Sequence, residues 1–375
     1  MKPTIIGFFL RDEIKTGSHK RYLELLNKIS LKNNKVIVIL SNTINTESYN
    51  FITIKVAPVT KGRLPFSLKQ ALKLLPIILK LQKDSYVVLS FGETNYLSLK
   101  LIKLLRKAKI IFAFRSNTFR ALKDENDNYR KSNNLKTFLK LKKMLFIEKD
   151  LTKISNKIIF QTAFDRDDIC TRTRTEIGKT SIIPNSINES WFLPEFRNTN
   201  NSNQLKTIIF LGSYSDRKGA IFLLNAIKIL HDSAHPIKLD MYGYGEEKIK
   251  LGLFIKENNL EEIVQLNNAI SNPISIIGKY DLMIVPSIYD SYPNVILESL
   301  FTGTPVIASN NSGMKEILYY EELLFETAEP KSIANRIKTL LNHDSYIDAK
   351  MLCKKRAEEH NFIWVDKFIT EIELL

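Results

Sequence analysis

The sequence predicts an α/β protein made of two doubly wound domains that face a central cleft. Short apolar segments typical of buried strands alternate with longer segments of helical periodicity along the chain. The length of 375 residues is enough for two domains of ordinary size. Residues 194–206 are polar, rich in Asn and without periodicity, and we interpret them as the linker between domains at 1–193 and 207–358.

The first half alternates strands with helices, which indicates a parallel sheet with helices on both faces. Residues 68–79 carry leucines at helical spacing, and we expect Pro76 to kink or shorten this helix. Two more helices are expected at 20–31 and 96–107. The expected strands are residues 5–10, 35–40, 86–90, 110–114, 157–161 and 181–184.

The second half repeats this alternation. Ligands of such sheets bind at the carboxyl ends of the strands, where the strand order reverses. We therefore expect a ligand in the cleft between the two domains. The expected strands are 207–211, 237–242, 263–266, 281–286 and 305–309, and the expected helices are 220–231, 246–258, 295–302, 314–320, 330–342 and 345–360.

Composition excludes several classes of protein. Apolar residues make up 44% of the chain and charged residues 25%, as in ordinary globular proteins. No window approaches the roughly 18 to 20 apolar residues that span a bilayer, so we expect no membrane-spanning segment. Cys170 and Cys353 form no close pair, and the five histidines show no metal-ligand spacing. We therefore expect reduced thiols in the cytoplasm and no bound metal.

Charge is distributed unevenly between the two halves. Residues 1–190 hold 36 Lys and Arg against 16 Asp and Glu, whereas residues 191–375 hold 19 against 24. A positive half suits an anionic partner, and we interpret it as a surface for an anionic membrane leaflet. The alternatives are solvated helix faces and a nucleic-acid surface, although no helix-turn-helix, zinc or RNP pattern is present. The lysines at helical spacing are Lys69, Lys73, Lys80, Lys100, Lys103, Lys107, Lys136, Lys140 and Lys143.

The segment 207–219, TIIFLGSYSDRKG, joins a strand to a helix through a polar loop. The strand ends at Gly212, and Lys218 stands where the helix opens. The N–H groups and the dipole at a helix start attract phosphate, and the lysine adds a positive charge. The segment matches neither G-x-G-x-x-G nor a P-loop, and a plain strand–loop–helix connection is an equally good interpretation.

The segment 285–303, VPSIYDSYPNVILESLFTG, places two carboxylates near one helix start. The helix is expected to begin near Pro293, with Asp290 before that start and Glu298 after it. Carboxylates accept paired hydrogen bonds from the vicinal hydroxyls of a sugar or a ribose. The N–H groups around residues 292–295 could hold a phosphate or sugar oxygen. The alternative is that Asp290 is an N-cap and Glu298 a surface charge.

Three further segments carry weaker signals. Gly313, within residues 304–317, could let the backbone approach a ligand closely, but a plain turn is an equally good interpretation. Residues 184–188, PNSIN, are best interpreted as a structural turn that ends the first domain. Residues 178–180, GKT, resemble the end of a P-loop but lack its first glycine.

Together these motifs resemble glycosyltransferase family 4, whose members are retaining enzymes of GT-B fold. The resemblance covers nearly the whole chain and is strongest from Pro184 to Glu316, where IVPSIYDSYPNVILESLFTGTPVIAS is similar to the signature region of the family. Residues 360–375 resemble the closing helix of the family, so we expect 359–375 to return to the first domain. The chain departs from the family pattern at Ser213, where the family has Arg, and at Asp290, where it has Glu.

The resemblance also implies roles for individual residues. The implied catalytic residues are Lys218 on the donor diphosphate, Asp290 on the donor sugar and Glu298 on the ribose. Arg115 and Asn117 stand where the N-terminal domain of the family lines the acceptor side. The residues expected to bind the donor are Gly17, Gly212, Ser213, Arg217, Gly243, Ser291, Tyr292, Pro293, Asn294 and Val295.

The resemblance implies retaining transfer of a hexose or N-acetylhexosamine from a nucleoside-diphosphate sugar, with UDP favoured and with no metal or cofactor. Combined with the basic half, it predicts a lipid-linked saccharide acceptor at the cytoplasmic leaflet. The product would be a cell-surface polysaccharide such as lipopolysaccharide, capsule or exopolysaccharide. The alternatives are a sugar-nucleotide epimerase or hydrolase, a non-catalytic sugar-nucleotide binder on the same fold, and a basic nucleic-acid-binding protein.

Overall fold

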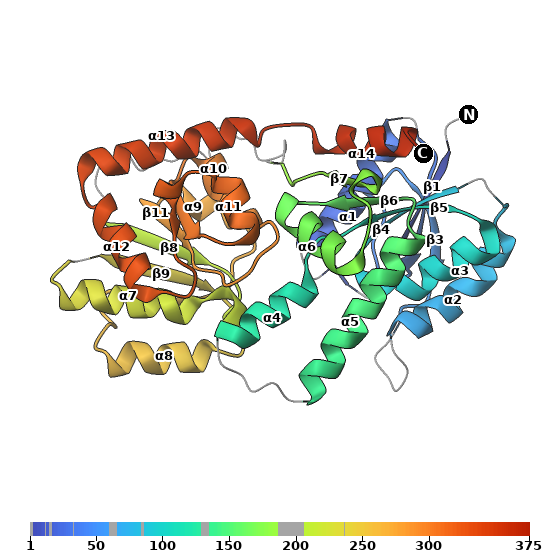
Figure 1. The fold of residues 1–375 in the computed structure, drawn as a ribbon. Helices are drawn as coiled ribbons and strands as arrows, with labels where there is room; N and C mark the ends of the chain where they lie inside the picture. Colours follow the sequence, from blue (N-terminus) through green and yellow to red (C-terminus); the bar gives the residue numbers. More distant parts are fainter. Residues whose placement is uncertain are drawn as a thin grey trace. The chain divides into compact units, whose positions relative to one another are not determined.

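The computed structural model of the chain forms two compact units (Figure 1). The first consists of Met1–Asn117, Lys136–Pro184 and Ile363–Leu375, and the second of Thr118–Leu135 and Asn185–Phe362. The residues that the structure describes are 3–11, 13–14, 17–32, 34–59, 66–83, 86–128, 135–186, 206–235 and 237–375.

The first unit is built on a parallel sheet whose strand order is β3-β2-β1-β4-β5-β6-β7. From β1 the chain adds β2 and β3 on one side, and then crosses to add β4 to β7 on the other side. The order therefore reverses between β1 and β4, as in a doubly wound sheet. The strands are β1 (Thr4–Phe9), β2 (Val36–Ser41), β3 (Ile52–Val56), β4 (Tyr86–Phe91), β5 (Lys109–Ala113), β6 (Lys157–Phe160) and β7 (Thr180–Ile182).

Alternate residues of each buried strand face opposite sides of this sheet, so both sides carry apolar side chains and are covered by helices. On one side, Ile6 and Phe8 of β1 share a core with Leu74 of α2 and Leu99 of α3. On the other side, α1 lies so close to β1 that a Cβ on Gly7 would come within 2.5 Å of the α1 leucine side chain at position 26. The helices are α1 (Gly17–Leu31), α2 (Phe66–Lys80), α3 (Tyr96–Arg106), α5 (Leu135–Ile154), α6 (Ala163–Thr173) and α14 (Trp364–Glu373).

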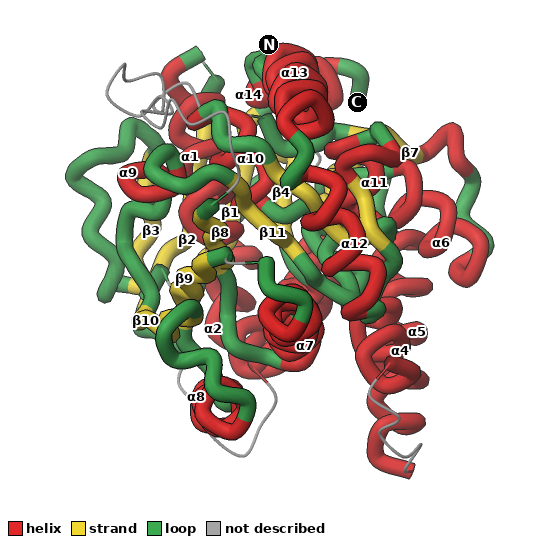
Figure 2. The backbone as a smooth tube through the Cα atoms, turned by 90° about the vertical axis from the view of Figure 1, so that its left-hand side faces the viewer, coloured by secondary structure: helices red, strands yellow, loops and turns green. Residues whose placement is uncertain are grey.

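The second unit repeats this plan with a parallel sheet of order β10-β9-β8-β11-β12-β13. Figure 2 shows β10, β9, β8 and β11 following one another side by side. The order reverses between β8 and β11, which lie next to each other. The strands are β8 (Thr207–Leu211), β9 (Lys238–Gly243), β10 (Val264–Asn268), β11 (Leu282–Val285), β12 (Val306–Ser309) and β13 (Leu324–Phe325).

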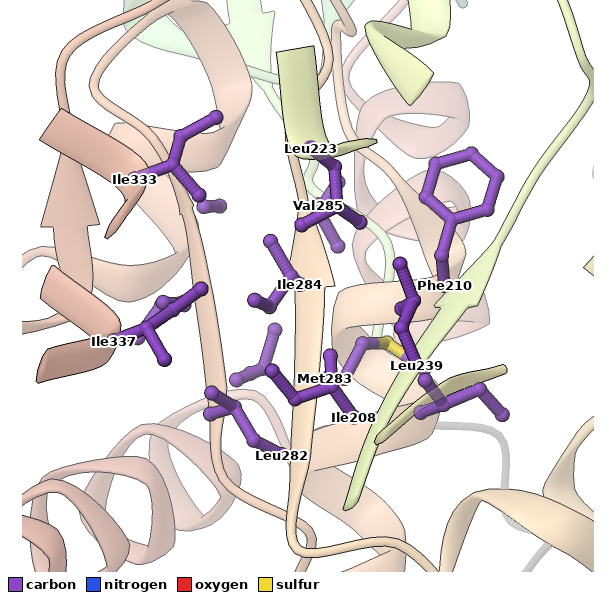
Figure 3. Packing of buried hydrophobic residues seen from close by; sticks show 14 of the residues in the cluster. Ile208, Phe210, Leu223, Leu239, Leu282, Met283, Ile284, Val285, Ile333 and Ile337 are labelled. Atoms are coloured by element: carbon purple, nitrogen blue, oxygen red, sulfur yellow. The ribbon is translucent and has the colours of Figure 1, made fainter. Parts of the chain in front are cut away.

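The core of the second unit is centred on β11, all of whose residues are buried. Figure 3 shows Ile333 and Ile337 of α12 beside this strand, with Leu223 of α7 and the side chains of β8 and β9 nearby. The helices are α4 (Thr118–Asn128), α7 (Ala220–Asp232), α8 (Lys248–Glu257), α9 (Ile274–Ile277), α10 (Asn294–Thr302), α11 (Ser312–Leu318), α12 (Pro330–Leu340) and α13 (His343–Glu359).

The predicted fold class of two doubly wound parallel sheets is confirmed, with differences in a few elements. Helix α2 continues past Pro76 to Lys80, so the expected shortening does not occur. Strand β3 was missed because it is an edge strand of half-buried and exposed residues, which leaves no apolar run. Residues 194–205 of the predicted linker lie outside the described residues, and the predicted domain boundaries stay predictions.

Candidate functional site

The candidate site of the second unit lies where β8 and β11 end next to each other. The strand order reverses between these two strands, and parallel α/β sheets bind ligands at the carboxyl end of such a reversal. Two loops start there, residues 212–219 after β8 and residues 286–293 after β11. These loops carry most of the residues that the sequence predicts for the donor.

The loop after β8 is held in place by a buried tyrosine. The hydroxyl of Tyr214 lies 2.9 Å from the carbonyl oxygen of Met241 and 2.7 Å from that of Asn267, so it links the loop to two neighbouring strands. Gly243 is the last residue of β9 and lies very close to this loop. A Cβ atom added to Gly243 would come within 2.0 Å of the carbonyl oxygen of Gly212. The predicted donor residues Gly212 and Gly243 are thus neighbours at the carboxyl edge of the sheet.

The two loops come into contact at Gly219. This residue has φ of 68° and joins a short 3-10 helix, η5 (Asp216–Lys218), to α7. A Cβ at this position would lie 2.0 Å from the carbonyl oxygen of Pro286, so only glycine fits. The N–H of Ile288 also donates to the carbonyl oxygen of Arg217 at 2.9 Å. The turn therefore brings its two cationic side chains to the end of β11.

Asp290 forms a charge cluster with these two cations. Its Oδ2 atom lies 2.5 Å from Nζ of Lys218 and 3.5 Å from Nη1 of Arg217. Burial raises the pKa of Asp290, but the charges and hydrogen bonds of Lys218 and Arg217 outweigh burial and hold the pKa below its ordinary value. The three side chains carry a formal excess of one positive charge. An anionic ligand at this edge would be attracted by that excess.

The remaining predicted donor residues lead into α10. Pro293 is the N-cap of this helix and Asn294 its first residue, so Asp290 does not cap α10 as the alternative interpretation required. Ser291 and Tyr292 are buried. Val295 lies in the first turn of α10, where backbone N–H groups can bind an anion. Glu298 is half-buried one turn further along the same helix.

Two residues outside the loops contact the second loop or the start of α10. The N–H of Gly313 donates to the carbonyl oxygen of Asp290 at 3.2 Å, and a Cβ on Gly313 would lie 1.6 Å from the carbonyl oxygen of Ser291. Asn185, from the PNSIN segment, donates from Nδ2 to Oδ1 of Asn294 at 2.9 Å. Gly313 therefore contacts the loop of residues 286–293, which we call the acidic loop, and Asn185 contacts the first residue of the helix that follows it.

The acidic loop also contacts a buried histidine, His360, for which the sequence predicted no role. Nδ1 of His360 lies 3.1 Å from the hydroxyl of Tyr292, and Nε2 lies 3.2 Å from the carbonyl oxygen of Ile317 and 3.1 Å from Nη2 of Arg356. The pKa of His360 is lowered to about 4, mainly by burial; the contact with Ile317 opposes this shift, and the charge of Arg356 adds to it.

The contact of Nε2 with a carbonyl oxygen favours the neutral tautomer that carries its hydrogen on Nε2, because a carbonyl oxygen can only accept. Nε2–H donates to Ile317, which leaves Nδ1 to accept the hydroxyl hydrogen of Tyr292. Arg356 also donates to the carbonyl oxygens of Ile317 at 2.6 Å and Glu316 at 3.0 Å. His360 and Arg356 therefore tie the acidic loop to the end of α11. Tyr292 and His360 are 68 positions apart in the chain, so no local spacing could reveal the pair.

The predicted acceptor-side residues lie in the first unit. Arg115 places its guanidinium 5.0 Å from the ring centre of Phe91 and 5.6 Å from that of Trp364. It lines a pocket of about 320 Å³ at the carboxyl ends of β1 and β4. Asn117 is fully buried and bonds instead with Asp168 at 2.6 Å and Arg172 at 2.7 Å.

Gly17, the last predicted donor residue, is the first residue of α1 in the first unit. The structure thus brings Gly212, Ser213, Arg217, Lys218 and Gly243 together with residues 290–295 in the second unit. Gly17, Arg115 and Asn117 belong to the first unit. The roles assigned to all these residues stay predictions.

Two general features of the described residues bear on the predicted partners. No helix among them is both long and apolar enough to cross a bilayer. In the same part of the chain, no three His, Cys, Asp or Glu side chains gather as a metal-binding group.

Comparison with protein families finds a similarity over much of the second unit. Residues 194–360 match the family model of glycosyl transferases group 1. An uncharacterized glycosyltransferase of Methanocaldococcus jannaschii is 28% identical over 68% of this chain and 63% of its own length. A Campylobacter jejuni N-acetylgalactosaminyltransferase is 31% identical over 41% of this chain and 42% of its own length. The matches thus span less than two thirds of these relatives.

The similarity to solved structures extends along nearly the whole chain. Sucrose-phosphate synthase of Thermosynechococcus elongatus superposes with a TM-score of 0.77 at 16% identity, covering 99% of this chain and 98% of that one. The Anabaena protein HepE in complex with UDP and glucose gives a TM-score of 0.72 at 13% identity, covering 98% of each chain. The chain therefore has the GT-B type of architecture, with two Rossmann-like parallel sheets.

Proposed function

We propose that the protein is a glycosyltransferase that moves a sugar from a nucleoside-diphosphate donor to a saccharide acceptor. One observation carries this proposal. The cations Arg217 and Lys218 meet Asp290 at the carboxyl ends of β8 and β11, within the segment that matches glycosyl transferases group 1.

In this proposal the charge cluster binds the donor diphosphate. Negative charge develops on the diphosphate as the glycosidic bond breaks, and fixed cations stabilise it there. Lys218 and Arg217 supply the charge, and N–H groups at the start of α10 supply hydrogen bonds. Asp290 keeps Lys218 oriented until the donor arrives and then contacts the sugar, while Glu298 holds the ribose. We further propose that transfer retains the anomeric configuration and needs no metal.

We propose a UDP-sugar as donor and a lipid-linked saccharide as acceptor. The fold neighbour HepE binds UDP and glucose, and the name of the Campylobacter relative specifies a diphospho-undecaprenol-linked substrate. A capsular polysaccharide glycosyltransferase of Staphylococcus aureus, 24% identical over 40% of this chain, supports a role in cell-surface polysaccharide synthesis. The basic first half would approach an anionic cytoplasmic leaflet.

Calorimetry with UDP, GDP, ADP and CMP tests the donor site. We expect one nucleotide to bind, and Lys218→Met to weaken binding by about tenfold to a hundredfold, because a charged hydrogen bond is worth about 1.5 to 3 kcal/mol. Lys228→Met is the matched control, since Lys228 also pairs with a carboxylate, Asp232 at 2.5 Å, but on the exposed side of α7. If no nucleotide binds at millimolar concentration, or both variants bind equally, the proposed donor site is wrong.

A further inference from the structure

A second cationic pocket lies in the first unit, at the edge of the sheet opposite to the expected ligand edge. Helices α5 and α6 end beside the amino ends of β6 and β7 (Figure 1). A pocket of about 630 Å³ opens there. The expected ligand edge of this sheet is the other one, where β1 and β4 end. The pocket is lined by Lys149, Thr152, Lys153, Thr173, Arg174, Thr175, Glu176 and Lys179.

Four of the lining side chains are cationic, against a single carboxylate from Glu176. Lys149 and Lys153 are one helical turn apart and lie on the same face of α5. Arg174 ends α6. Within the described part of the chain, no carboxylate lies within ion-pair distance of Lys149, Lys153 or Arg174. In that part of the chain these three cations therefore form no ion pair, although the charge of Lys153 also acts on the carboxylate of Asp150.

The fourth cation, Lys179, already has a structural role. Its Nζ donates to the carbonyl oxygens of Thr152 at 2.7 Å and Lys153 at 3.3 Å, which caps the end of α5. Burial lowers the pKa of Lys179, and the charge of Lys103 lowers it further while Glu176 opposes the shift. Among the described residues, no comparable contact with a backbone carbonyl is made by the side chains of Lys149, Lys153 or Arg174.

We propose that this pocket binds a phosphate group. Lysines act as point charges for phosphate, and the planar guanidinium of Arg174 can donate two hydrogen bonds to it. The hydroxyl of Thr173 donates to the carbonyl oxygen of Ile169 at 2.6 Å and accepts the hydroxyl hydrogen of Thr175 at 2.8 Å, so the hydrogen bonds to a phosphate would come from the cationic side chains. The pocket volume accommodates a phosphate together with the small group that carries it.

The site differs from a P-loop even though Lys179 belongs to the GKT sequence. In a P-loop the lysine reaches the phosphates, whereas Lys179 turns to the end of α5. The site also differs from the lysine set that the sequence predicted for a membrane surface. Among that set, Lys100 pairs with Asp150 at 2.6 Å and Lys73 donates to the carbonyl oxygen of Pro58 at 2.6 Å.

The ligand phosphate could belong to a soluble molecule or to a lipid headgroup, and two measurements separate these sources. The first titrates the intact protein with inorganic phosphate at constant ionic strength. The second measures cosedimentation with vesicles of phosphatidylcholine, with and without phosphatidylglycerol. The test variant is Lys153→Gln/Arg174→Gln, which spares Lys179. The control is Lys35→Gln/Lys55→Gln, which removes the same charge from exposed positions of the same unit that belong neither to the pocket nor to the lysine set predicted for a membrane surface.

We expect the test variant to weaken one of the two interactions at least tenfold and the control variant to weaken neither to that extent. Loss of phosphate binding alone identifies a soluble ligand, and loss of vesicle binding identifies a lipid headgroup. The proposed donor cluster is unchanged in both variants, so its own affinity for phosphate cancels in the comparison. Equal behaviour of the two variants in both measurements would overturn the proposal, whatever the outcome for nucleotide binding.

Discussion

The two units each contain a carboxylate paired with cations, and the two pairs are built differently. In the first unit, Glu148 is 1% exposed and receives two hydrogen bonds from Arg172, at 2.8 and 3.1 Å. Arg172 also bonds with Asp168 and with Asn117. In the second unit, Asp290 faces Lys218 and Arg217, and both members of its close pair are nearly one-fifth exposed.

We interpret the first pair as structural, and the second is the one that the proposed function places at the donor. The side chains around Arg172 come mostly from α5 and α6, and together they carry a formal excess of negative charge. Those around Asp290 come from two loops at a sheet edge and carry a formal excess of positive charge. The first arrangement satisfies its members within the unit, whereas the second leaves an attractive site for an anion.

Arg172→Met should have the largest effect on stability. Removing one partner leaves Glu148 as an uncompensated buried charge, which costs about 3 to 5 kcal/mol. Urea unfolding should show this loss, and the nucleotide affinity of the folded protein should not change. The double variant Glu148→Leu/Arg172→Met should recover much of the stability, because an apolar pair replaces the ionic one. A loss that persists in the double variant would mean that the network does more than pair charges.

Lys218→Met should show the reverse pattern. Loss of a cation that stabilises the leaving diphosphate should lower the rate of sugar transfer by about a hundredfold to a thousandfold. We expect the free energy of unfolding to fall less than in Arg172→Met, since Asp290 keeps Arg217 as a neighbour. Transfer rates and urea unfolding of both variants, measured side by side, check the comparison. A Lys218→Met protein that transfers sugar normally would show that its pair is structural too.

The sequence could predict the fold and the two loops because these depend on local patterns. Strand β11 is a continuous apolar run, and Asp290 and Lys218 each stand a few residues after a strand end. The supporting contacts could not be predicted, because Asn185, Gly313 and His360 reach the loop from distant positions in the chain. Asn117 was assigned to the acceptor side, and nothing local indicated its buried bonds with Asp168 and Arg172.

His360 should make stability depend on pH. Its pKa is about 4 in the folded protein, mainly through burial, and about 6.5 in the unfolded chain. As the pH falls below 6.5, the unfolded chain takes up the proton first. The free energy of unfolding is therefore highest above pH 6.5. It falls by about 3 kcal/mol as the pH is lowered from about 6.5 to 4.

Unfolding free energies at pH 7.5, 5.5 and 4.5 check this dependence. His360→Asn should remove most of the change between these values. His19→Asn is the control, because the pKa of His19 is also lowered by burial but its side chain is only half-buried and lies in the first unit. If His19→Asn removes the dependence instead, His360 does not titrate as the structure implies.

Tyr292→Phe should have the smallest effect on stability but should affect nucleotide binding. Without the hydroxyl, Nδ1 of His360 is left as a buried acceptor without its partner, which costs about 1 to 2 kcal/mol. The acidic loop also loses one of its links to α11, while the bond from Gly313 to Asp290 remains, so nucleotide affinity should fall several-fold. Tyr346→Phe is the matched control, since Tyr346 is equally buried and donates to the carbonyl oxygen of Asp281 at 2.7 Å, away from the loop. It should lose similar stability and keep its nucleotide affinity. Equal affinities for the two variants would mean that His360 supports the fold without positioning the loop.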